Sequence, residues 1–298
     1  MSVYAGGLRA LVAALFVISL AGVVRSETAA ESVASGDRFY ALRGEKNDGL
    51  GHADPGQIER AIAAYERAHA EAPENIEAAW KLMAALFFAG DFAAQSDAAA
   101  QAFFERGKDV SEQALPLLKK RLGLPSDLSS MDTLKIREAV PPKLRENVAS
   151  LYFWSAIDWG AWSRYEGLLS VVRSGVAGRL RDYSKVSLSL DPTIYRGGAQ
   201  RLMAHLNATL PRVPFISGWV KRSDALVYAN EAMAILSDDM GNQTILGLSL
   251  VETVPKRRSE GIEILEKVIL MKPRSDLVVE DQATQELARE TLAKERND

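Results

Sequence analysis

The feature that most constrains the fold is a spaced set of small, aromatic and proline residues. Ala61, Tyr65, Ala68 and Pro73 follow one another at helical intervals within a charged, amphipathic stretch. Small alanines let two helices approach closely, an aromatic ring fills the remaining gap, and proline ends the second helix of the pair. This spacing predicts a helical hairpin that cannot bury its apolar face alone and must stack on a neighbour.

The pattern returns near the carboxyl end of the chain. The same four positions are taken there by Gly261, Leu265, Val268 and Pro273, and the alanine positions of the preceding unit by Ala225, Ala229 and Ala232. These positions match a 34-residue tetratricopeptide unit. No segment alternates apolar and polar residues as a strand does. The sequence therefore predicts an all-α fold, an α-solenoid of three or four degenerate tetratricopeptide-like helix-turn-helix units.

The amino-terminal segment predicts export. Residues 1–26 combine a positive charge, an uncharged apolar run from Ala10 to Val24 and small residues before a cleavage point after Ser26, the order of a secretory signal. The alternative is an uncleaved anchor, although the run is short for a spanning helix. We expect a periplasmic protein. The chain contains no cysteine, so it cannot be a lipoprotein.

Residues 27–298 are predicted to form a single helical-repeat domain. Its one interruption is an irregular connection at about 106–143, where Pro116, Pro125, Pro141 and Pro142 break the helical pattern. A boundary between two domains is less consistent with the sequence, because neither half contains the number of repeats that a solenoid needs.

Composition and motifs argue against several functional classes. The formal net charge of −3 argues against nucleic-acid binding, because proteins that bind nucleic acids usually carry a cluster of basic residues on one face. The three histidines, His52, His69 and His205, are not at metal-ligand spacing. Phosphate-binding, dinucleotide-binding and serine-hydrolase motifs are all missing from the sequence. We therefore predict a protein that is not an enzyme and uses no cofactor or metal.

An aromatic helix predicted from Asn147 onward is the first candidate for a site. Tyr152, Trp159 and Trp162 share one helical face, whereas Trp154 points elsewhere. Aromatic residues at helical spacing mostly form core. The functional alternative is a cavity wall lined by Trp154, Trp159 and Tyr195, suited to an apolar or mixed ligand.

Two charged residues in apolar surroundings are the second candidate. Asp158 lies between Ile157 and Trp159, and Arg201 follows the glycine pair Gly197 and Gly198. Buried charges are normally paired, so each is expected to have a protein partner, and the two could pair with each other. Alternatively, Arg201 binds an anionic ligand, since its guanidinium fits carboxylates. The candidate binding residues are Tyr152, Trp154, Asp158, Trp159, Tyr195 and Arg201.

The order of these features resembles one known family. The features are the aromatic helix, a basic amphipathic helix, the break at Asp191 and Pro192, the Gly197-Gly198-x-x-Arg201 motif, Leu210-Pro211, Ser217-Gly218 before Lys221, and the stretch Asn242–Glu252. Together they resemble the T-component of TRAP transporters (the TatT family), over about residues 39–292. The chain departs from the family where Leu202, Met203 and Ala204 follow Arg201, and in having no cysteine for a lipid.

The resemblance implies a periplasmic accessory protein of a TRAP-type solute uptake system. It also implies a homotrimer with a pore, association with the periplasmic substrate-binding protein, and a small hydrophobic or carboxylated ligand. The residues alone are equally consistent with a general envelope scaffold that binds proteins through its repeat groove and has no role in transport.

Overall fold

The computed structural model describes residues 27–297, so the predicted signal segment lies outside the described residues. Thirteen α-helices occupy this part of the chain: α1 (Ala29–Ala41), α2 (Pro55–Glu71), α3 (Ile76–Phe88), α4 (Asp97–Arg121), α5 (Thr133–Ala139), α6 (Arg145–Ser163), α7 (Leu168–Arg173), α8 (Val176–Leu190), α9 (Gly198–Thr209), α10 (Arg222–Ile235), α11 (Met240–Thr253), α12 (Arg258–Ile269) and α13 (Val278–Asn297). Residues 27–297 contain no strand, only an isolated bridge between Asn47 and Ala53. The predicted all-α class is confirmed.

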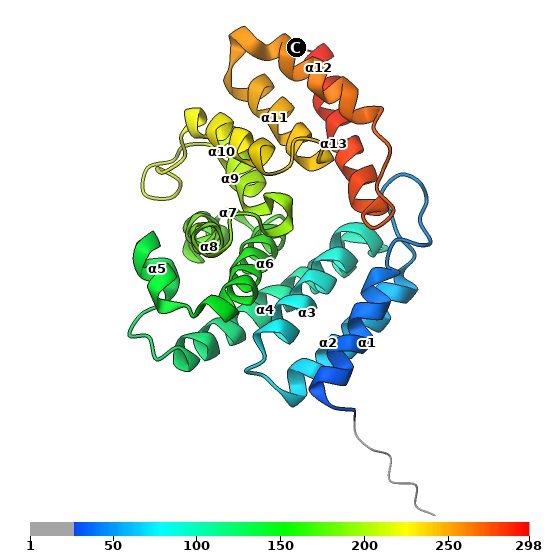
Figure 1. Ribbon diagram of the computed structural model, residues 1–298. Coiled ribbons are helices and arrows are strands. Elements are labelled where there is room, and N and C mark those ends of the chain that lie inside the picture. Colours follow the sequence, from blue (N-terminus) through cyan, green and yellow to red (C-terminus); the bar gives the residue numbers. More distant parts are fainter. Residues whose placement is uncertain (1–26, 298) are drawn as a thin grey trace, which may run out of the picture.

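Successive helices pack against one another in two runs (Figure 1). In the first run α1 packs on α2, α2 on α3 and α3 on α4, and in the second run α9 to α12 follow the same rule. Helix α6 contacts α3, α4 and α8, and α8 contacts α9, so α6 and α8 join the two runs. This succession of neighbouring pairs is the architecture of a helical repeat protein.

The residues that predicted the first hairpin lie between its helices. Ala61, Tyr65 and Ala68 of α2 are fully buried, and Gly36 of α1 faces the Tyr65 ring. A Cβ atom at Gly36 would lie 2.4 Å from Cε1 of that ring. Only glycine therefore allows α1 to approach the aromatic side chain this closely.

In the second run, glycine residues again allow two helices to approach closely, here with one backbone against the other. Gly247 of α11 and Gly261 of α12 face each other, and a Cβ atom at Gly261 would lie 2.7 Å from the Gly247 carbonyl oxygen. Ala225, Ala229 and Ala232 of α10 are all fully buried. The small residues that marked the repeats in the sequence are thus the points of closest helix contact.

The predicted irregular connection at 106–143 begins later than expected. Helix α4 continues through Pro116 to Arg121, and the irregular part is confined to residues 122–144, which contain α5 and two short 3₁₀ turns. An internal proline costs a helix roughly 3 kcal/mol. Burial of Phe104, Val110 and Leu118 on the same helix offsets this, because each buried side chain stabilises by about 1.5–3 kcal/mol.

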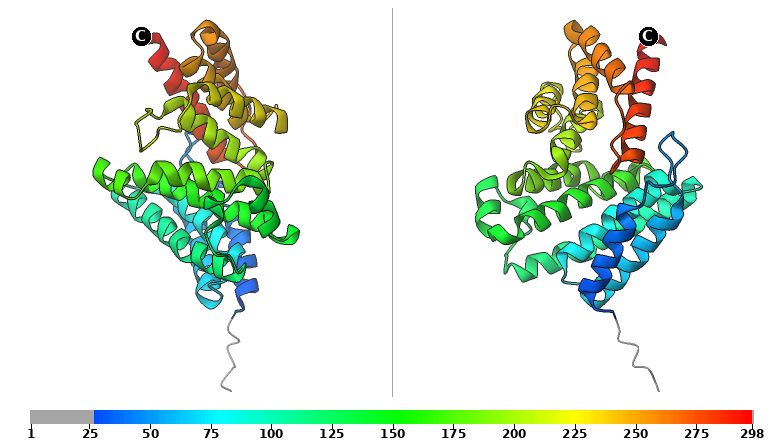
Figure 2. Two further views of the ribbon diagram at one scale, coloured as in Figure 1. Left: turned by 90° about the vertical axis from the view of Figure 1, so that its left-hand side faces the viewer. Right: turned by 45° about the vertical axis from the view of Figure 1, so that its right-hand side comes forward.

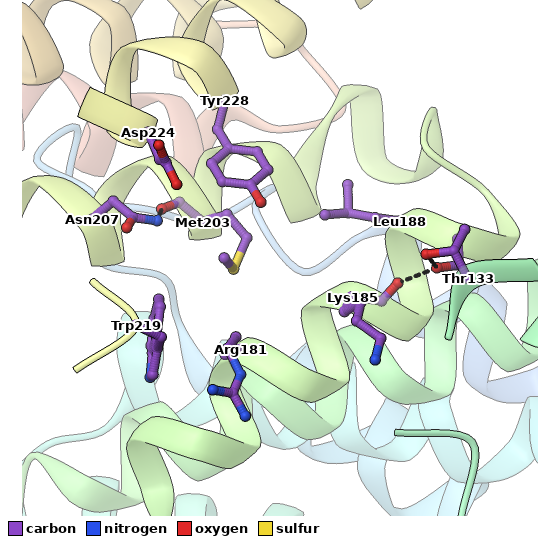
Figure 3. A pocket seen from close by; sticks show the side chains of 10 residues that line it. Thr133, Arg181, Lys185, Leu188, Met203, Asn207, Trp219, Asp224 and Tyr228 are labelled. Carbon is purple, nitrogen blue, oxygen red and sulfur yellow. Dashed lines mark hydrogen bonds between the residues drawn. The ribbon is translucent and has the colours of Figure 1, made fainter. Parts of the chain in front are cut away.

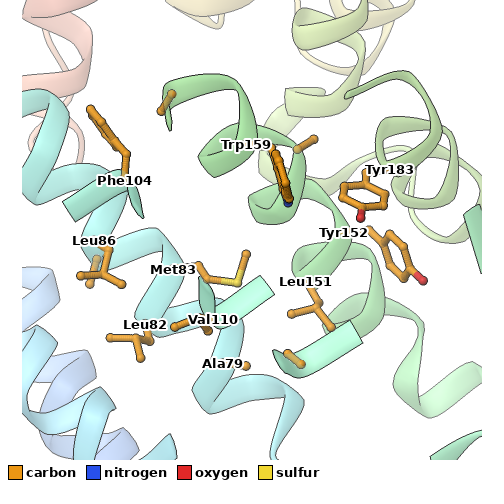
Figure 4. Packing of buried hydrophobic residues seen from close by; sticks show 14 of the residues in the cluster. Ala79, Leu82, Met83, Leu86, Phe104, Val110, Leu151, Tyr152, Trp159 and Tyr183 are labelled. Atoms are coloured by element: carbon orange, nitrogen blue, oxygen red, sulfur yellow. The ribbon is translucent and has the colours of Figure 1, made fainter. Parts of the chain in front are cut away.

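The main hydrophobic core lies where α3, α4, α6 and α8 meet (Figure 4). Its largest fully buried side chains include Met83, Phe104, Leu151 and Tyr152. Because α6 is apolar on more than one face, it can contact helices on several sides. The helix is therefore a fixed central element that can position side chains at its edges.

The last helix returns to the first hairpin. In Figures 1 and 2, α13 reaches the loop that follows α1. The Arg43 guanidinium donates to Glu280 with its Nε at 2.9 Å, and Gly51 packs against the Ala283 backbone. This contact brings the two runs of helices together around a cleft. Within residues 27–297, no helix has both the length and the apolar character needed to cross a membrane.

Candidate ligand-binding cleft

Two cavities lie on either side of a paired tryptophan and tyrosine, Trp154 and Tyr195. The larger has a volume of about 370 Å³ and lies between α1, α6, α9 and the beginning of α13. The smaller, 220 Å³, lies between α1, α2, α3 and α6. Tyr40, Trp154 and Tyr195 border both. We call the larger cavity the central cleft.

Aromatic side chains form one wall of the central cleft. Trp154 Nε1 donates a hydrogen bond to Tyr195 Oη at 2.8 Å, and the two ring centroids are 5.5 Å apart. The Phe153 ring lies 4.8 Å from that of Tyr195. Burial raises the pKa of the Tyr195 hydroxyl, so the wall carries no charge at neutral pH. It is an apolar surface with its polar atoms already paired.

A strained turn holds Tyr195 in this position. Tyr195 and Arg196 have φ angles of 48° and 57°, and Gly197 follows with 89°. Two consecutive left-handed residues other than glycine are uncommon, and each costs roughly 1–2 kcal/mol. The surrounding structure must therefore stabilise this turn from outside.

Arg201 supplies that stabilisation. Its guanidinium donates to the carbonyl oxygens of Tyr195 and Arg196, both at 2.9 Å, and to Asn242 Oδ1 at 2.8 Å. Burial lowers the pKa of Arg201, and the nearby Asp239 carboxylate opposes this effect. Two of its hydrogen bonds thus go to the turn and a third goes to Asn242. Arg201 borders the cleft, but it acts chiefly as a positioning residue for Tyr195.

Asn242 completes the support from α11. The side chain is fully buried, and its amide nitrogen lies within hydrogen-bonding distance of three carbonyl oxygens, those of Arg196, Ala232 and Leu236. The side chain therefore connects the strained turn to the end of α10. These contacts explain why the Gly-Gly-x-x-Arg motif and the downstream asparagine occur together in the sequence.

The cleft is also rich in arginine, and most of these side chains are paired with acids. Arg43 is bonded to Glu280, and Arg274 is bonded to the buried carboxylates of Asp239 and Asp281. Hydrogen bonding to Asp281 and Asp239 raises the pKa of Arg274, so the guanidinium stays charged. It forms a fixed, neutralised wall.

Arg196 differs from the other arginines of the cleft. Its only ion pair among the described residues is with Asp276, at 3.2 Å, and the two side chains are 42% and 63% exposed. Pairs this exposed contribute little stability. An incoming carboxylate can therefore replace Asp276 at low cost, next to the aromatic ring of Tyr195.

The predicted site residues divide into two groups. Trp154, Tyr195 and Arg201 come together at the central cleft. Tyr152, Asp158 and Trp159 lie in the core and do not border it. The predicted cavity wall is therefore wrong in including Trp159, which packs on Trp162 with ring centroids 5.4 Å apart.

The possible pairing of Asp158 with Arg201 is also wrong. Asp158 faces Gly107 of α4 instead, and neither carboxylate oxygen has a hydrogen-bond partner among the described residues. Burial raises the pKa of this carboxyl well above its ordinary value. Tyr152 does find a partner, since its hydroxyl donates to Asp127 at 2.9 Å.

Sequence reasoning missed Tyr40, Arg43, Arg196 and Arg274 as cleft residues. Three of them come from the two ends of the chain, which meet only through the return of α13, so no local pattern could reveal them. A signal did exist for Arg196, because it lies between the predicted Tyr195 and the glycine pair.

Comparisons with known proteins give no assignment: no protein-family model matches the chain, and no curated protein matches it significantly. The geometry alone therefore indicates the chemistry. An accessible guanidinium beside an aromatic wall suits a molecule that carries a carboxylate on an apolar body.

Proposed function

We propose that the protein is an accessory component of a TRAP-type solute uptake system in the periplasm, working by binding without catalysis. The transport assignment rests on the family resemblance of the sequence, from the aromatic helix to Asn242. The observation that carries the binding role is the meeting of Trp154, Tyr195 and Arg196 at one cleft.

The ligand that fits this cleft is a small carboxylate with an apolar body. The cavity volume of 370 Å³ falls within the range of small-molecule sites. Arg196 receives the carboxylate, and Trp154 and Tyr195 contact the apolar part. Arg43 and Arg274 contribute less to recognition, because their donors are already bonded to Glu280, Asp239 and Asp281.

A second surface supports the docking of a partner protein. Phe215 is fully exposed and has a φ angle of 65°, in the loop between α9 and α10. The loop is braced internally: Ser217 Oγ donates to the Pro211 carbonyl at 2.5 Å and accepts from the Val213 amide at 3.0 Å. A rigid loop that displays an aromatic side chain at an energetic cost is suited to inserting that side chain into a partner.

Ligand binding is tested with octanoate, and octanol serves as the uncharged control. We expect octanoate to change the fluorescence of Trp154 and to bind at least about tenfold more weakly to Arg196→Gln, as loss of a charge-assisted hydrogen bond implies. Octanol should bind the protein and this variant equally. Equal octanoate affinity for both proteins would contradict the assignment of Arg196.

Partner binding is tested by light scattering with the substrate-binding protein of the proposed uptake system. The proposal expects a trimer that forms a complex with it, and expects Phe215→Gly to weaken the complex while leaving the fold intact. The control is Leu270→Gly, since Leu270 is 85% exposed and directly follows α12, away from the loop that contains Phe215. A monomer that forms no complex would overturn the transport proposal.

A further inference from the structure

A third cavity lies away from the central cleft and shares no lining residue with it. Its volume is 400 Å³, and it lies between α8, α9, α10 and the loop that ends at Lys221. Figure 3 shows side chains from these separate elements pointing into one space. We call it the lateral cavity.

Each of three helices gives this cavity two side chains four residues apart. Helix α8 gives Arg181 and Lys185, α9 gives Met203 and Asn207, and α10 gives Asp224 and Tyr228. Residues at this interval lie on one helical face. The lateral cavity is therefore bounded by the regular faces of packed helices and is not an accident of a loose loop.

Several polar groups of the lateral cavity are already satisfied. Arg181 makes two hydrogen bonds to Asp182, at 2.7 and 2.9 Å. Asn207 donates to the Met203 carbonyl at 2.9 Å and accepts from the Lys221 amide at 2.8 Å. These hydrogen bonds fix the positions of Arg181 and Asn207 in the cavity walls.

Two charged groups have no ion pair in the described part of the chain, and they have opposite signs. Lys185 has no salt bridge there, and Asp224 accepts only from the neighbouring Ser223 hydroxyl at 3.2 Å. Figure 3 shows Asp224 on the α10 side and Lys185 on the α8 side, with Met203 between them. The cavity thus has a negative and a positive end separated by an apolar middle.

A buried donor without an acceptor also borders this space. Trp219 Nε1 is shielded from solvent and has no hydrogen-bond partner among residues 27–297. An indole N–H is a donor only, so it requires an acceptor such as a carbonyl oxygen. Leaving such a group unpaired costs roughly 1–3 kcal/mol. Because Nε1 is shielded from solvent, Trp219 offers a ligand its ring and not its N–H.

We propose that the lateral cavity binds a short zwitterionic peptide with apolar side chains. Its terminal carboxylate pairs with Lys185, its ammonium group with Asp224, and its apolar side chains contact Met203 and the aromatic ring of Tyr228. A free amino acid fits less well, because it carries both charges on one carbon and the two protein charges lie on opposite walls.

The experiment is calorimetry with the dipeptide Leu-Phe in three forms: free, amino-terminally acetylated, and carboxyl-terminally amidated. We expect the free peptide to bind most tightly and each capped form to bind at least about tenfold more weakly. These three titrations use the unaltered protein, so they do not depend on the folding of a variant.

Two variants then assign the ends. Lys185→Met should lower affinity for the free peptide and remove the difference between free and amidated forms, while acetylation still weakens binding. Asp224→Asn should give the reverse pattern. Arg196→Gln, a change in the central cleft, should alter none of these values, so the two sites are tested separately.

Two results would overturn the proposal. One is equal affinity for the three forms of the peptide, or no binding of the free form at millimolar concentration. The other is that Lys185→Met and Asp224→Asn both lower affinity equally for the free, acetylated and amidated peptides. Such a result would mean that the two residues maintain the shape of the cavity and do not pair with the ends of the peptide.

Discussion

Replacing the buried carboxyl of Asp158 by an amide gives the sharpest test of the structure. Asp158 is fully buried between α6 and α4, and its oxygens have no hydrogen-bond partner among the described residues. It faces Gly107, where an added Cβ atom would lie 2.6 Å from the carboxyl group. Burial is the cause of its raised pKa.

The sign of the pH effect follows from proton binding. In the unfolded chain the carboxyl releases its proton near pH 4, whereas the folded protein retains it to higher pH. Between these two pKa values the folded state binds more protons, so stability decreases as pH rises. Between the two pKa values the slope approaches about 1.4 kcal/mol per pH unit.

The measurement is urea unfolding of the protein and of Asp158→Asn at several pH values between about 5 and 7. Groups common to both proteins cancel in the difference, and the asparagine does not titrate. We expect the variant to become more stable relative to the parent as the pH rises, by up to about 1.4 kcal/mol per pH unit. Glu105→Gln, at an exposed position of α4, should show no such trend. A difference for Asp158→Asn that does not change with pH would refute the reasoning.

Three further predictions concern stability and can be measured by urea unfolding. Arg201→Met removes three hydrogen bonds from the strained turn and should cost about 3 kcal/mol or more, because a buried amide and two carbonyls lose their partner. Gly36→Ala forces a methyl group against the Tyr65 ring and should cost about 1–3 kcal/mol, whereas Gly178→Ala, in α8 with no atom within 4 Å of the new Cβ, should stabilise by about 0.5–1 kcal/mol. Phe215→Gly relieves a left-handed backbone and should stabilise by about 1 kcal/mol, so a loss of partner binding in this variant could not be attributed to unfolding.

The repeated hairpins could be predicted from the sequence because their contacts are local and periodic. Ala61, Tyr65 and Ala68 lie on one face of one helix, and helix approach depends directly on the size of such residues. Helix α4 was harder to predict. Pro116 is a local signal for a break, and only the burial of the whole helix against α3 and α6 overrides it.

The central cleft was predictable only in part, for a related reason. Trp154 was found because the aromatic helix is visible in the sequence, and Tyr195 because it lies beside the glycine pair Gly197 and Gly198. Arg43 and Arg274 reach the cleft only because α13 returns to α1, which no local pattern reveals. Likewise, helical period placed Trp154 apart from Tyr152 and Trp159, yet could not show which face borders an open space.

The role of Arg201 shows how a correct residue can be given an incomplete interpretation. A buried arginine after a glycine pair does suggest an anion site, since guanidinium groups bind carboxylates. However, carbonyl oxygens of left-handed residues also attract such a group, and here Tyr195 and Arg196 supply two of them. Gly197 then continues the turn, with a φ angle of 89°, and lets Arg201 reach back to it. The motif therefore holds Tyr195 against Trp154 and leaves Arg196 exposed beside the cleft. The arginine available to a ligand is thus Arg196, although the motif itself contains Arg201.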